Sequence, residues 1–313
     1  MKIFVTGVAG QLGHDVMNEL AKRGHEGIGT DLAPAYSGIQ DGTAVTQMDY
    51  ISLDITDKEA VHAVLTKFHP DAVIHCAAWT AVDAAEDAEN QEKVHRINAD
   101  GTAYIAAACK EIGAKMMYIS TDYVFNGQGS APWEPDCKAY SPLNVYGKTK
   151  LEGELAVSET LSNYFIVRIA WVFGKNGKNF IKTMLNLGKT RDTLSVVCDQ
   201  IGTPTYTFDL ARLLVDMIET EKYGYYHATN EGGYISWYDF TVEIFRQAAL
   251  LGHPEYDAEH MTVHPVTTAE YGISKAARPF NSRLDKSKLT ANGFIPLPDW
   301  KDALARYLKE LTF

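Results

Sequence analysis

Short apolar runs alternate with longer stretches of helical periodicity through the first half of the chain. Strands are expected at Lys2–Thr6, Glu26–Asp31, Asp71–Ala77, Lys115–Ser120 and Phe165–Trp171. These runs are nearly continuous in apolar and β-branched residues, which is typical of parallel strands that are buried on both faces. The alternation therefore predicts a doubly wound α/β domain, in which helices cover both faces of a parallel sheet.

Helical segments fill the gaps between the strands, because apolar residues recur there every three or four positions. Helices are expected at Gly10–Arg23, Asp57–Phe68, Asn90–Ile112 and Tyr146–Leu161. After Gly174 prolines interrupt this rhythm, which predicts a smaller C-terminal α/β domain built from shorter elements.

We expect a first domain over residues 1–173 and a second mainly over residues 174–313. The apolar helix Tyr206–Ile218 and the strand Tyr225–Ala228 are expected to return to the large sheet. Residues 206–230 would then belong to the first domain, so that the two domains interleave.

Composition excludes several classes of partner. The 313 residues carry a formal net charge of −11, which disfavours nucleic acid and anionic membranes, because both require a basic face. No apolar segment approaches the ~20 residues that span a bilayer.

The four cysteines are widely spaced and form no CxxC pair. We therefore expect free thiols in a reducing cytoplasm, and no metal site.

A glycine-rich loop joins the first strand to the first helix. Gly7, Gly10 and Gly13 follow a G-x-x-G-x-x-G spacing, and Ala9, Gln11 and Leu12 lie between them. Glycines at these positions permit a tight turn and a close approach of the backbone to a pyrophosphate. The N-terminus of the following helix offers unpaired N–H groups to the anion. The loop predicts a bound dinucleotide, which makes residues 1–173 the dinucleotide-binding domain and the smaller domain the substrate-binding one.

Further cofactor contacts are expected at the ends of the next strands. Asp31 ends the second strand, where a carboxylate accepts hydrogen bonds from the ribose hydroxyls and repels a 2′-phosphate. This favours NADH over NADPH. Contacts are also expected from Asp54, Ile55, Ala77, Ala78 and Trp79. A solvated Asp31 and simple packing at Ala77–Trp79 are the alternatives.

The segment Tyr146–Lys150 carries the clearest catalytic pattern. Tyr146 and Lys150 stand four positions apart, so both project from one face of a helix. The Lys150 ammonium is expected to lower the pKa of the Tyr146 hydroxyl. Thr121 closes the strand Lys115–Ser120, and ligands of open α/β sheets bind at the carboxyl ends of strands. Thr121 would therefore hold a substrate carbonyl while Tyr146 protonates it.

With these motifs the chain resembles the extended short-chain dehydrogenase/reductases and, within them, the dTDP-4-dehydrorhamnose reductase family. The matching segments run nearly from end to end. They are Gly7–Gly13, Cys76–Asp83, Ser120–Gly127, Tyr146–Glu154, Arg168–Gly174, Asn179–Phe180, Asp199–Thr205 and Arg278–Asp285. The Thr-Asp-Tyr-Val-Phe and Asp-Gln-x-Gly-x-Pro-Thr blocks are specific to this family, whereas the glycine and Tyr-x-x-x-Lys motifs mark only the superfamily.

The resemblance implies hydride transfer from NADH, or from NADPH, to the C4 carbonyl of dTDP-4-dehydro-L-rhamnose. It implies that Tyr146 gives the proton, that Lys150 tunes Tyr146 and holds the nicotinamide ribose, and that Asn98 supports the cofactor site. Asp122 and Trp171 match positions in contact with the substrate. Donors for the nucleotide diphosphate are expected from Asn179, Gln200, Arg278 and Asn281, for each of which anchoring of a loop is the alternative.

Further features of the sequence narrow the alternatives or leave them open. Tyr123 stands where related dehydratases carry a glutamate, which disfavours dehydration. Another sugar-nucleotide reductase or an epimerase fits the same motifs, as does a non-catalytic subunit like that of methionine adenosyltransferase. The resemblance also allows a homodimer, and in some relatives a magnesium ion near the position of Asp15. The stretch Ala33–Val45 is longer than the usual connection and is expected to pack over the cofactor.

Overall fold

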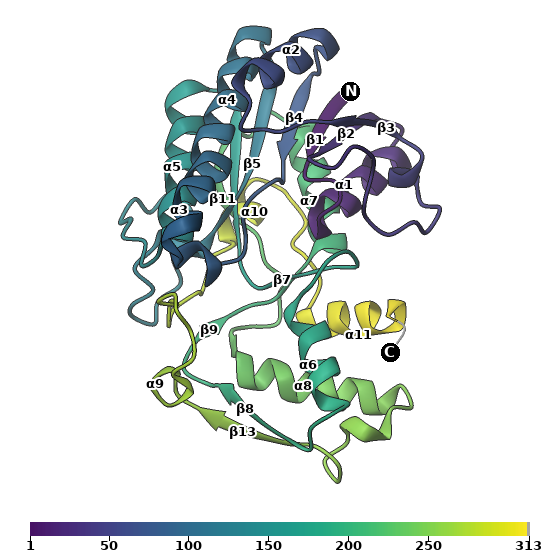
Figure 1. Cartoon of the computed structure of the whole chain (residues 1–313), viewed down its shortest axis with the longest axis vertical. Coiled ribbons are helices and arrows are strands. Elements are labelled where there is room, and N and C mark those ends of the chain that lie inside the picture. The colour runs from purple at the N-terminus through teal and green to yellow at the C-terminus, as the bar shows by residue number, and fades with distance from the viewer. Residues whose placement is uncertain (312–313) are drawn as a thin grey trace.

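A parallel sheet of seven strands forms the centre of the larger part of the molecule (Figure 1). The computed structural model describes residues 1–311. The strands follow the spatial order β11-β6-β5-β4-β1-β2-β3, and every neighbouring pair is parallel. They are β1 (Lys2–Thr6), β2 (Glu26–Asp31), β3 (Asp49–Ser52), β4 (Ala72–His75), β5 (Lys115–Thr121), β6 (Tyr164–Ile169) and β11 (Gly224–His227). This order confirms the predicted doubly wound, Rossmann-like fold.

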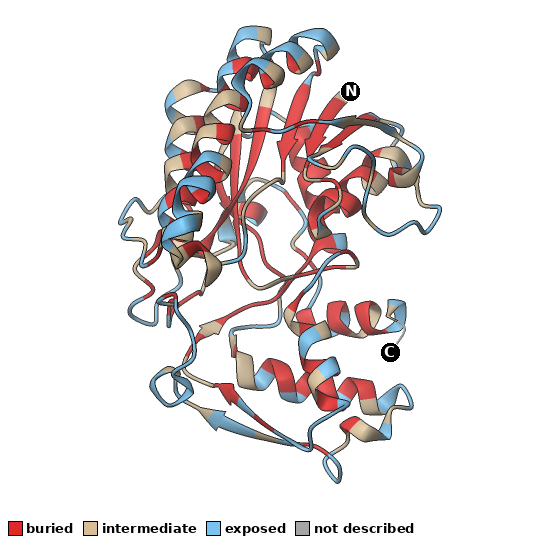
Figure 2. Cartoon of the chain, in the orientation of Figure 1, coloured by how far each residue is buried: buried red, intermediate tan, exposed pale blue. Residues whose placement is uncertain are grey.

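Helices cover both faces of the sheet. One face packs against α1 (Gln11–Lys22), α7 (Thr207–Ile218) and α10 (Ser287–Ala291). The other face packs against α2 (Lys58–Phe68), α4 (Gly101–Ile112) and α5 (Val145–Thr160), and α3 (Ala88–His95) precedes α4. The central strands are buried along most of their length (Figure 2). Burial on both faces explains why their sequences read as continuous apolar runs.

The smaller part of the molecule lies beyond the carboxyl end of the sheet (Figure 1). Its core joins α6 (Phe180–Gly188), α8 (Trp237–Leu250) and α11 (Trp300–Glu310) to β8 (Thr193–Val197). Short strands pair as β8 with β13 (Thr262–Val266), β7 (Val172–Phe173) with β10 (Thr205–Tyr206), and β9 (Ile201–Gly202) with β12 (Ile235–Ser236). The short helix α9 (Thr268–Tyr271) follows β13. The prolines thus separate short elements, as expected.

The chain passes between the two parts more than once. β11 pairs with β6 at the edge of the large sheet, and α7 packs in the same core as α1. α10 also joins this core through Leu289, which the sequence pattern did not indicate. The division at residue 173 into a dinucleotide-binding and a substrate-binding domain stays a prediction.

Two predicted elements differ from those observed. The expected helix Asn90–Ile112 is observed as continuous helical backbone from Ala88 to Ile112, but a π-helical turn at Arg96–Asp100 interrupts its α-helical hydrogen bonding between α3 and α4. The expected strand Phe165–Trp171 ends at Ile169, since Trp171 adopts a left-handed backbone with φ of 52°. No strand continues through that conformation. Both departures occur in segments that contribute to the site described below.

Candidate active site

A cavity of about 840 Å³ opens at the carboxyl end of the sheet. It lies where the strand order reverses, between β1 and β4, which is where ligands of doubly wound sheets bind. Most of the residues singled out in the sequence line it. These are Gly7, Ala9, Gly10, Gln11, Leu12, Gly13, Asp31, Asp54, Ile55, Ala77, Ala78, Thr121, Asp122, Tyr146, Lys150 and Trp171.

The glycine loop is packed so closely that side chains cannot replace two of its glycines. Gly7 has a φ of 72°, and a Cβ there would lie 2.7 Å from the backbone nitrogen of Ala77. A Cβ on Gly13 would lie 2.3 Å from the carbonyl oxygen of Gly7. Helix α1 begins after Gly10 with no side-chain cap on its first turn. Its N–H groups thus remain for an anion in the cavity, so the loop fits a dinucleotide pyrophosphate.

Two carboxylates lie at the strand ends beside this loop. Asp31 accepts the backbone N–H of Ala9 at 3.0 Å through one oxygen and that of Leu32 at 2.8 Å through the other. It therefore fixes the phosphate loop as well as facing the cavity. Asp54 accepts only local hydrogen bonds, from the backbone and hydroxyl of Thr56.

Helix α5 positions the predicted catalytic pair. Asn144 caps the helix by accepting the backbone N–H of Gly147 at 2.8 Å, which places Tyr146 in the first turn and Lys150 one turn later. The Lys150 Nζ donates to the carbonyl of Ile119 at 2.7 Å. The Tyr146 hydroxyl hydrogen-bonds to that of Thr121, at the end of β5. Strand β5 and helix α5 therefore bring the three groups together.

Burial dominates the electrostatics of this pair. It raises the pKa of Tyr146 above its ordinary value, and the neighbouring hydroxyl of Thr121 opposes this only in part. Burial also lowers the pKa of Lys150 to about 7, although Glu154 favours the charged form. The expected lowering of the Tyr146 pKa by Lys150 is not seen in this structure, because burial raises that pKa and Lys150 is not among the groups that shift it. The phenol consequently keeps its proton at neutral pH.

Two indole rings form the wall of the cavity on the side of the smaller part. The rings of Trp171 and Trp237 stack with centroids 3.6 Å apart, and Phe180 lies 4.5 Å from Trp237. A Cβ on Gly202 would lie 2.9 Å from the Trp171 ring, so this glycine makes room for it. The left-handed backbone of Trp171 is costly for a bulky residue, and the packing around the ring holds it in place.

Two predicted cofactor residues do not line the cavity. Asn98 lies in the π-helical turn, and its carboxamide accepts the backbone N–H of Trp79 at 2.8 Å and donates to Thr149 at 3.1 Å. The indole of Trp79 turns back to donate to the carbonyl of Ala81. Asn98 therefore holds the loop after β4 against α5. Its support of the site is indirect.

Three of the predicted diphosphate ligands bond to neighbouring loops, which agrees with the alternative that these side chains anchor loops. Asn179 caps α6 and donates to Gln11, Gly174 and Tyr307. Asn281 donates to the carbonyls of Gln128 and Ala131, and Gln200 donates to Thr268. None of the three lines the cavity. A polar side chain in a motif can anchor a loop as readily as it binds a ligand.

Arg278 also lies outside the cavity lining. Its guanidinium donates to Asp83 at 2.6 Å and to the hydroxyl of Tyr123 at 3.3 Å. The ring of Tyr123 in turn meets that of Tyr146 edge to face, with centroids 5.5 Å apart. Arg278 thus supports the site through Tyr123.

Sequence reasoning missed several residues that line the cavity. Trp237 and Phe180 come from the smaller part, and Lys178 precedes Phe180 on an exposed loop. Thr80 and Val82 follow the segment at Ala77–Trp79. Phe180 and the stretch around Thr80 lay inside matching segments and could have been found there. Trp237 belonged to none, and only the fold brings it beside Trp171.

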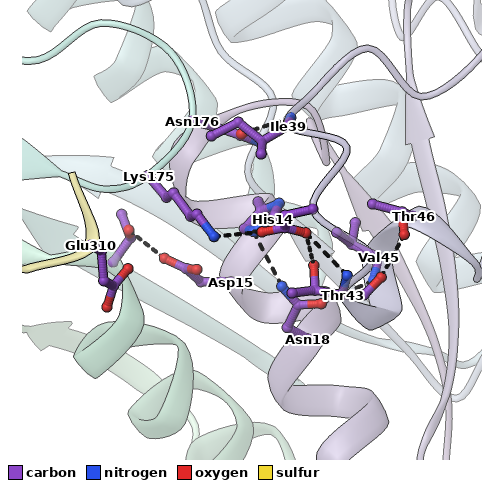
Figure 3. Close-up of polar contacts among 12 residues, drawn as sticks. His14, Asp15, Asn18, Ile39, Thr43, Val45, Thr46, Lys175, Asn176 and Glu310 are labelled. Atoms are coloured by element: carbon purple, nitrogen blue, oxygen red, sulfur yellow. Dashed lines mark hydrogen bonds and ion pairs between the residues drawn. The ribbon is translucent and has the colours of Figure 1, made fainter. Parts of the chain in front are cut away.

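The stretch Ala33–Val45 lies against the connection that leads into the smaller part, where Asn176 accepts the backbone N–H of Ile39 at 2.9 Å (Figure 3). The hydroxyl of Tyr36 accepts from Asn176 at 3.1 Å, and Lys175 donates to Asp41 at 2.6 Å. Gly177 and Lys178, which follow these partners, line the cavity. The stretch therefore ties the first helix region to one rim of the site.

Asp15 lies in α1 beside α7 (Figure 3). Its carboxylate accepts the hydroxyl of Thr207 at 2.5 Å, and burial raises its pKa to about 7. The neighbouring Asp209 is paired with Arg306 at 2.7 Å. Both acids are engaged by donors of the chain itself. Within residues 1–311 no group of three histidine, cysteine, aspartate or glutamate side chains is placed to hold a metal ion.

Two further structural findings concern the whole described chain. All four cysteines are free thiols. None of the helices within residues 1–311 has both the length and the apolarity required to cross a membrane.

A doubly wound sheet, a glycine loop at its switch point, and a Thr-Tyr-Lys set beside it define a nicotinamide-dependent oxidoreductase of the short-chain type. The chain belongs to the family described as the RmlD substrate binding domain, whose model matches residues 1–313.

Similar proteins match this chain in sequence or in structure over nearly its full length. A dTDP-4-dehydrorhamnose reductase of Aggregatibacter actinomycetemcomitans is 37% identical over 310 residues, which cover 97% of each protein. The crystal structure of a dTDP-4-dehydrorhamnose reductase from Clostridium acetobutylicum matches with a TM-score of 0.86 at 41% identity and covers 100% of both chains. The Bacillus anthracis dTDP-4-dehydrorhamnose reductase, solved in complex with NADP, matches with a TM-score of 0.84 at 37% identity. That match covers 99% of this chain and 100% of the other.

Proposed function

We propose that this protein reduces the C4 keto group of dTDP-4-dehydro-L-rhamnose to give dTDP-L-rhamnose, with NADH as the preferred cofactor and NADPH as the second choice. The observation that carries the proposal is the placement of Thr121, Tyr146 and Lys150 together in a cavity whose other end is the glycine loop. The full-length likeness to reductases of this substrate supports the choice of sugar nucleotide.

The nicotinamide cofactor, when bound, supplies the hydride that adds to the carbonyl carbon. The glycine loop and the N-terminus of α1 would hold its pyrophosphate, and Asp31 would accept hydrogen bonds from the adenosine ribose. Tyr146 donates its phenolic proton to the carbonyl oxygen as negative charge develops there. Burial keeps Tyr146 protonated at neutral pH, so that it has a proton to give.

Lys150 has two tasks in this proposal. Its ammonium, held by the Ile119 carbonyl, stabilises the phenolate that Tyr146 leaves behind. It also donates to the nicotinamide ribose, since an ammonium carries three hydrogens and only one is used by Ile119. Burial holds the pKa of Lys150 at about 7, so activity should decline above that pH as the charge is lost.

The sugar nucleotide lies, in this proposal, against the wall formed by Trp171 and Trp237. Asp122 faces the same space and contributes to the position of the sugar. We also propose a cytoplasmic location, which the free thiols support. A homodimer is the assembly to test, by sedimentation of the purified protein.

Absorbance of NADH tests the proposal directly. With dTDP-4-dehydro-L-rhamnose the wild-type protein should consume one NADH per product formed, whereas an epimerase would regenerate its cofactor and show no net loss. Replacing Tyr146 by phenylalanine removes the acid and should lower kcat by about 10²- to 10⁴-fold.

Cofactor binding serves as the control for Tyr146→Phe, because the hydroxyl is lost while the ring remains. NADH fluorescence should titrate as in the wild type. Full activity in Tyr146→Phe would refute the assigned acid, and a wild-type protein that binds NADH but never consumes it would favour a binding subunit.

A further inference from the structure

The hydroxyl of Thr121 is surrounded by more partners than its single hydrogen can serve. Its oxygen lies 3.0 Å from Oδ1 of Asp122 and accepts the backbone N–H of Tyr123 at 3.2 Å. It also hydrogen-bonds to the Tyr146 hydroxyl. A threonine hydroxyl has one hydrogen to donate and two lone pairs to accept with. These three contacts therefore use its full capacity.

The protonation state of Asp122 decides where that hydrogen points. An ionised carboxylate can only accept, so Thr121 must donate to it, and the remaining lone pair of Thr121 takes the proton of Tyr146. The Tyr146 hydrogen is then directed at Thr121 and away from a substrate. In this state neither hydroxyl can donate to a carbonyl oxygen.

A neutral Asp122 reverses the direction of the chain. The acid donates to Thr121, the second lone pair of Thr121 is filled, and the threonine hydrogen is free for a substrate carbonyl. Tyr146 then has no acceptor at Thr121 and turns its own hydrogen to the same carbonyl. Both donors that the reduction requires become available together.

We propose that Asp122 is a positioning residue for the reduction, and that the productive complex holds it in its neutral, hydrogen-donating form. The inference rests on the proposed function, because it assigns a direction to the hydrogen bonds of that same site.

The surroundings of Asp122 suit such a role. It is buried, with a side chain that faces the cavity from the turn after β5. Its Oδ1 bonds to Thr121, its buried Oδ2 has no hydrogen-bond partner among residues 1–311, and Ser282 lies nearby. Tyr123 and Tyr146 are the titratable groups that feel its charge. Burial raises the pKa of Asp122 to about 6. Lys150 is the cation of the same cavity, and burial lowers its pKa to about 7. The effect of Lys150 on the pH profile must therefore be distinguished from that of Asp122.

The test compares Asp122→Asn with wild type, because an asparagine donates to Thr121 permanently through its amide N–H. For both proteins kcat/KM for dTDP-4-dehydro-L-rhamnose is measured with saturating NADH from pH 5 to pH 6.5. At each pH the kcat/KM of the variant is divided by that of wild type. The effect of Lys150 cancels in this ratio. For an acid that titrates near pH 6 the ratio should rise about fourfold over this range.

A ratio that stays flat with pH would overturn the inference, as would an Asp122→Asn protein that binds NADH normally yet is inactive at every pH. In the matched control, Thr121→Val carries no hydroxyl, so Asp122→Asn introduced into that variant should give a flat ratio.

If the Asp122→Asn protein fails to fold, the single variant Thr121→Val still tests the inference. Its residual activity should lack the decline near pH 6 that wild type shows, and a decline that persists in this variant would count against the inference. No NADH oxidation by wild type at any pH would refute the proposed function and this inference with it. Turnover with a flat ratio refutes the inference and leaves the function standing.

Discussion

Asp31 combines two tasks in one carboxylate. It holds the phosphate loop through Ala9 and faces the place expected for the adenosine ribose. Replacing Asp31 by alanine should lower kcat/KM for NADH by about tenfold or more, since a charged hydrogen bond contributes roughly 1.5–3 kcal/mol. NADPH should be used relatively better, because the charge that repels its 2′-phosphate is gone.

Steady-state kinetics with each cofactor in turn measure this change. Asp54→Ala is the matched control, because Asp54 lines the same cavity but bonds only to Thr56. It should leave the ratio of the two cofactor efficiencies within about threefold of wild type. An Asp31→Ala protein with an unchanged ratio would contradict the role of Asp31 in cofactor choice.

Single residues also mark the limit of what the sequence predicts about the site. The glycine loop and the Tyr146–Lys150 pair are local patterns, so their spacing indicates their chemistry. Asn179 and Asn281 looked like ligands, but their partners come from Tyr307 and Ala131, far away in sequence. Whether a polar group is free for a ligand depends on such distant partners, which the sequence alone does not place.

The contact between α1 and α7 carries a pH-dependent cost. Burial raises the pKa of Asp15 from 3.8 to about 7, so the folded chain binds a proton that the unfolded chain has released between these values. Stability therefore falls as pH rises from about 4 to about 7. Asp15→Asn removes the ionisation and should stabilise the fold by about 2–4 kcal/mol at pH 8, but by only about 0.5 kcal/mol at pH 4.

Thermal unfolding at the two pH values checks this expectation. Asp216→Asn is the control from the same helix pair, because Asp216 is partly exposed and accepts from Arg23. It should cost at most about 1 kcal/mol. An Asp15→Asn protein that is less stable than wild type at pH 8 would show that the carboxylate is favourable where it lies.

Elements were predictable where their stabilisation is local. Strand β2 follows its expected bounds, and α2 starts where Asp57 caps the backbone N–H of Ala60. No such local signal marks the π-helical turn at Arg96–Asp100. The turn directs Asn98 toward the loop at Trp79, which is a contact between distant segments. Such turns are often found at functional sites. The break at Trp171 likewise follows from packing against Trp237 and not from its own sequence.

The charge of the whole molecule bears on how it binds its ligands. With a net charge of −11 and two anionic ligands expected, long-range repulsion works against binding. The cavity compensates locally through the uncapped end of α1, Lys150 and the exposed Lys178. The acidic balance disfavours polymeric anions as partners, whereas local donors determine whether small anions bind.

The interleaving of the two parts predicts that residues 1–173 do not fold alone. One face of the large sheet is covered by α7, whose Leu213, Leu214, Met217 and Ile218 are fully buried. Each such side chain contributes about 2 kcal/mol when buried, so the lost cover is of the order of the whole stability of a domain. The fragment also lacks β11, which leaves β6 as an exposed edge strand.

A fragment of residues 1–173 should therefore show no cooperative thermal transition and no NADH binding, whereas the full chain should unfold in one transition. A fragment of residues 1–230 restores α7 and β11 and is the matched control. It should recover measurable NADH binding, because the glycine loop packs on α1 and α1 packs on α7. Cooperative unfolding and NADH binding by residues 1–173 would mean that the cofactor site is independent of the returning segment.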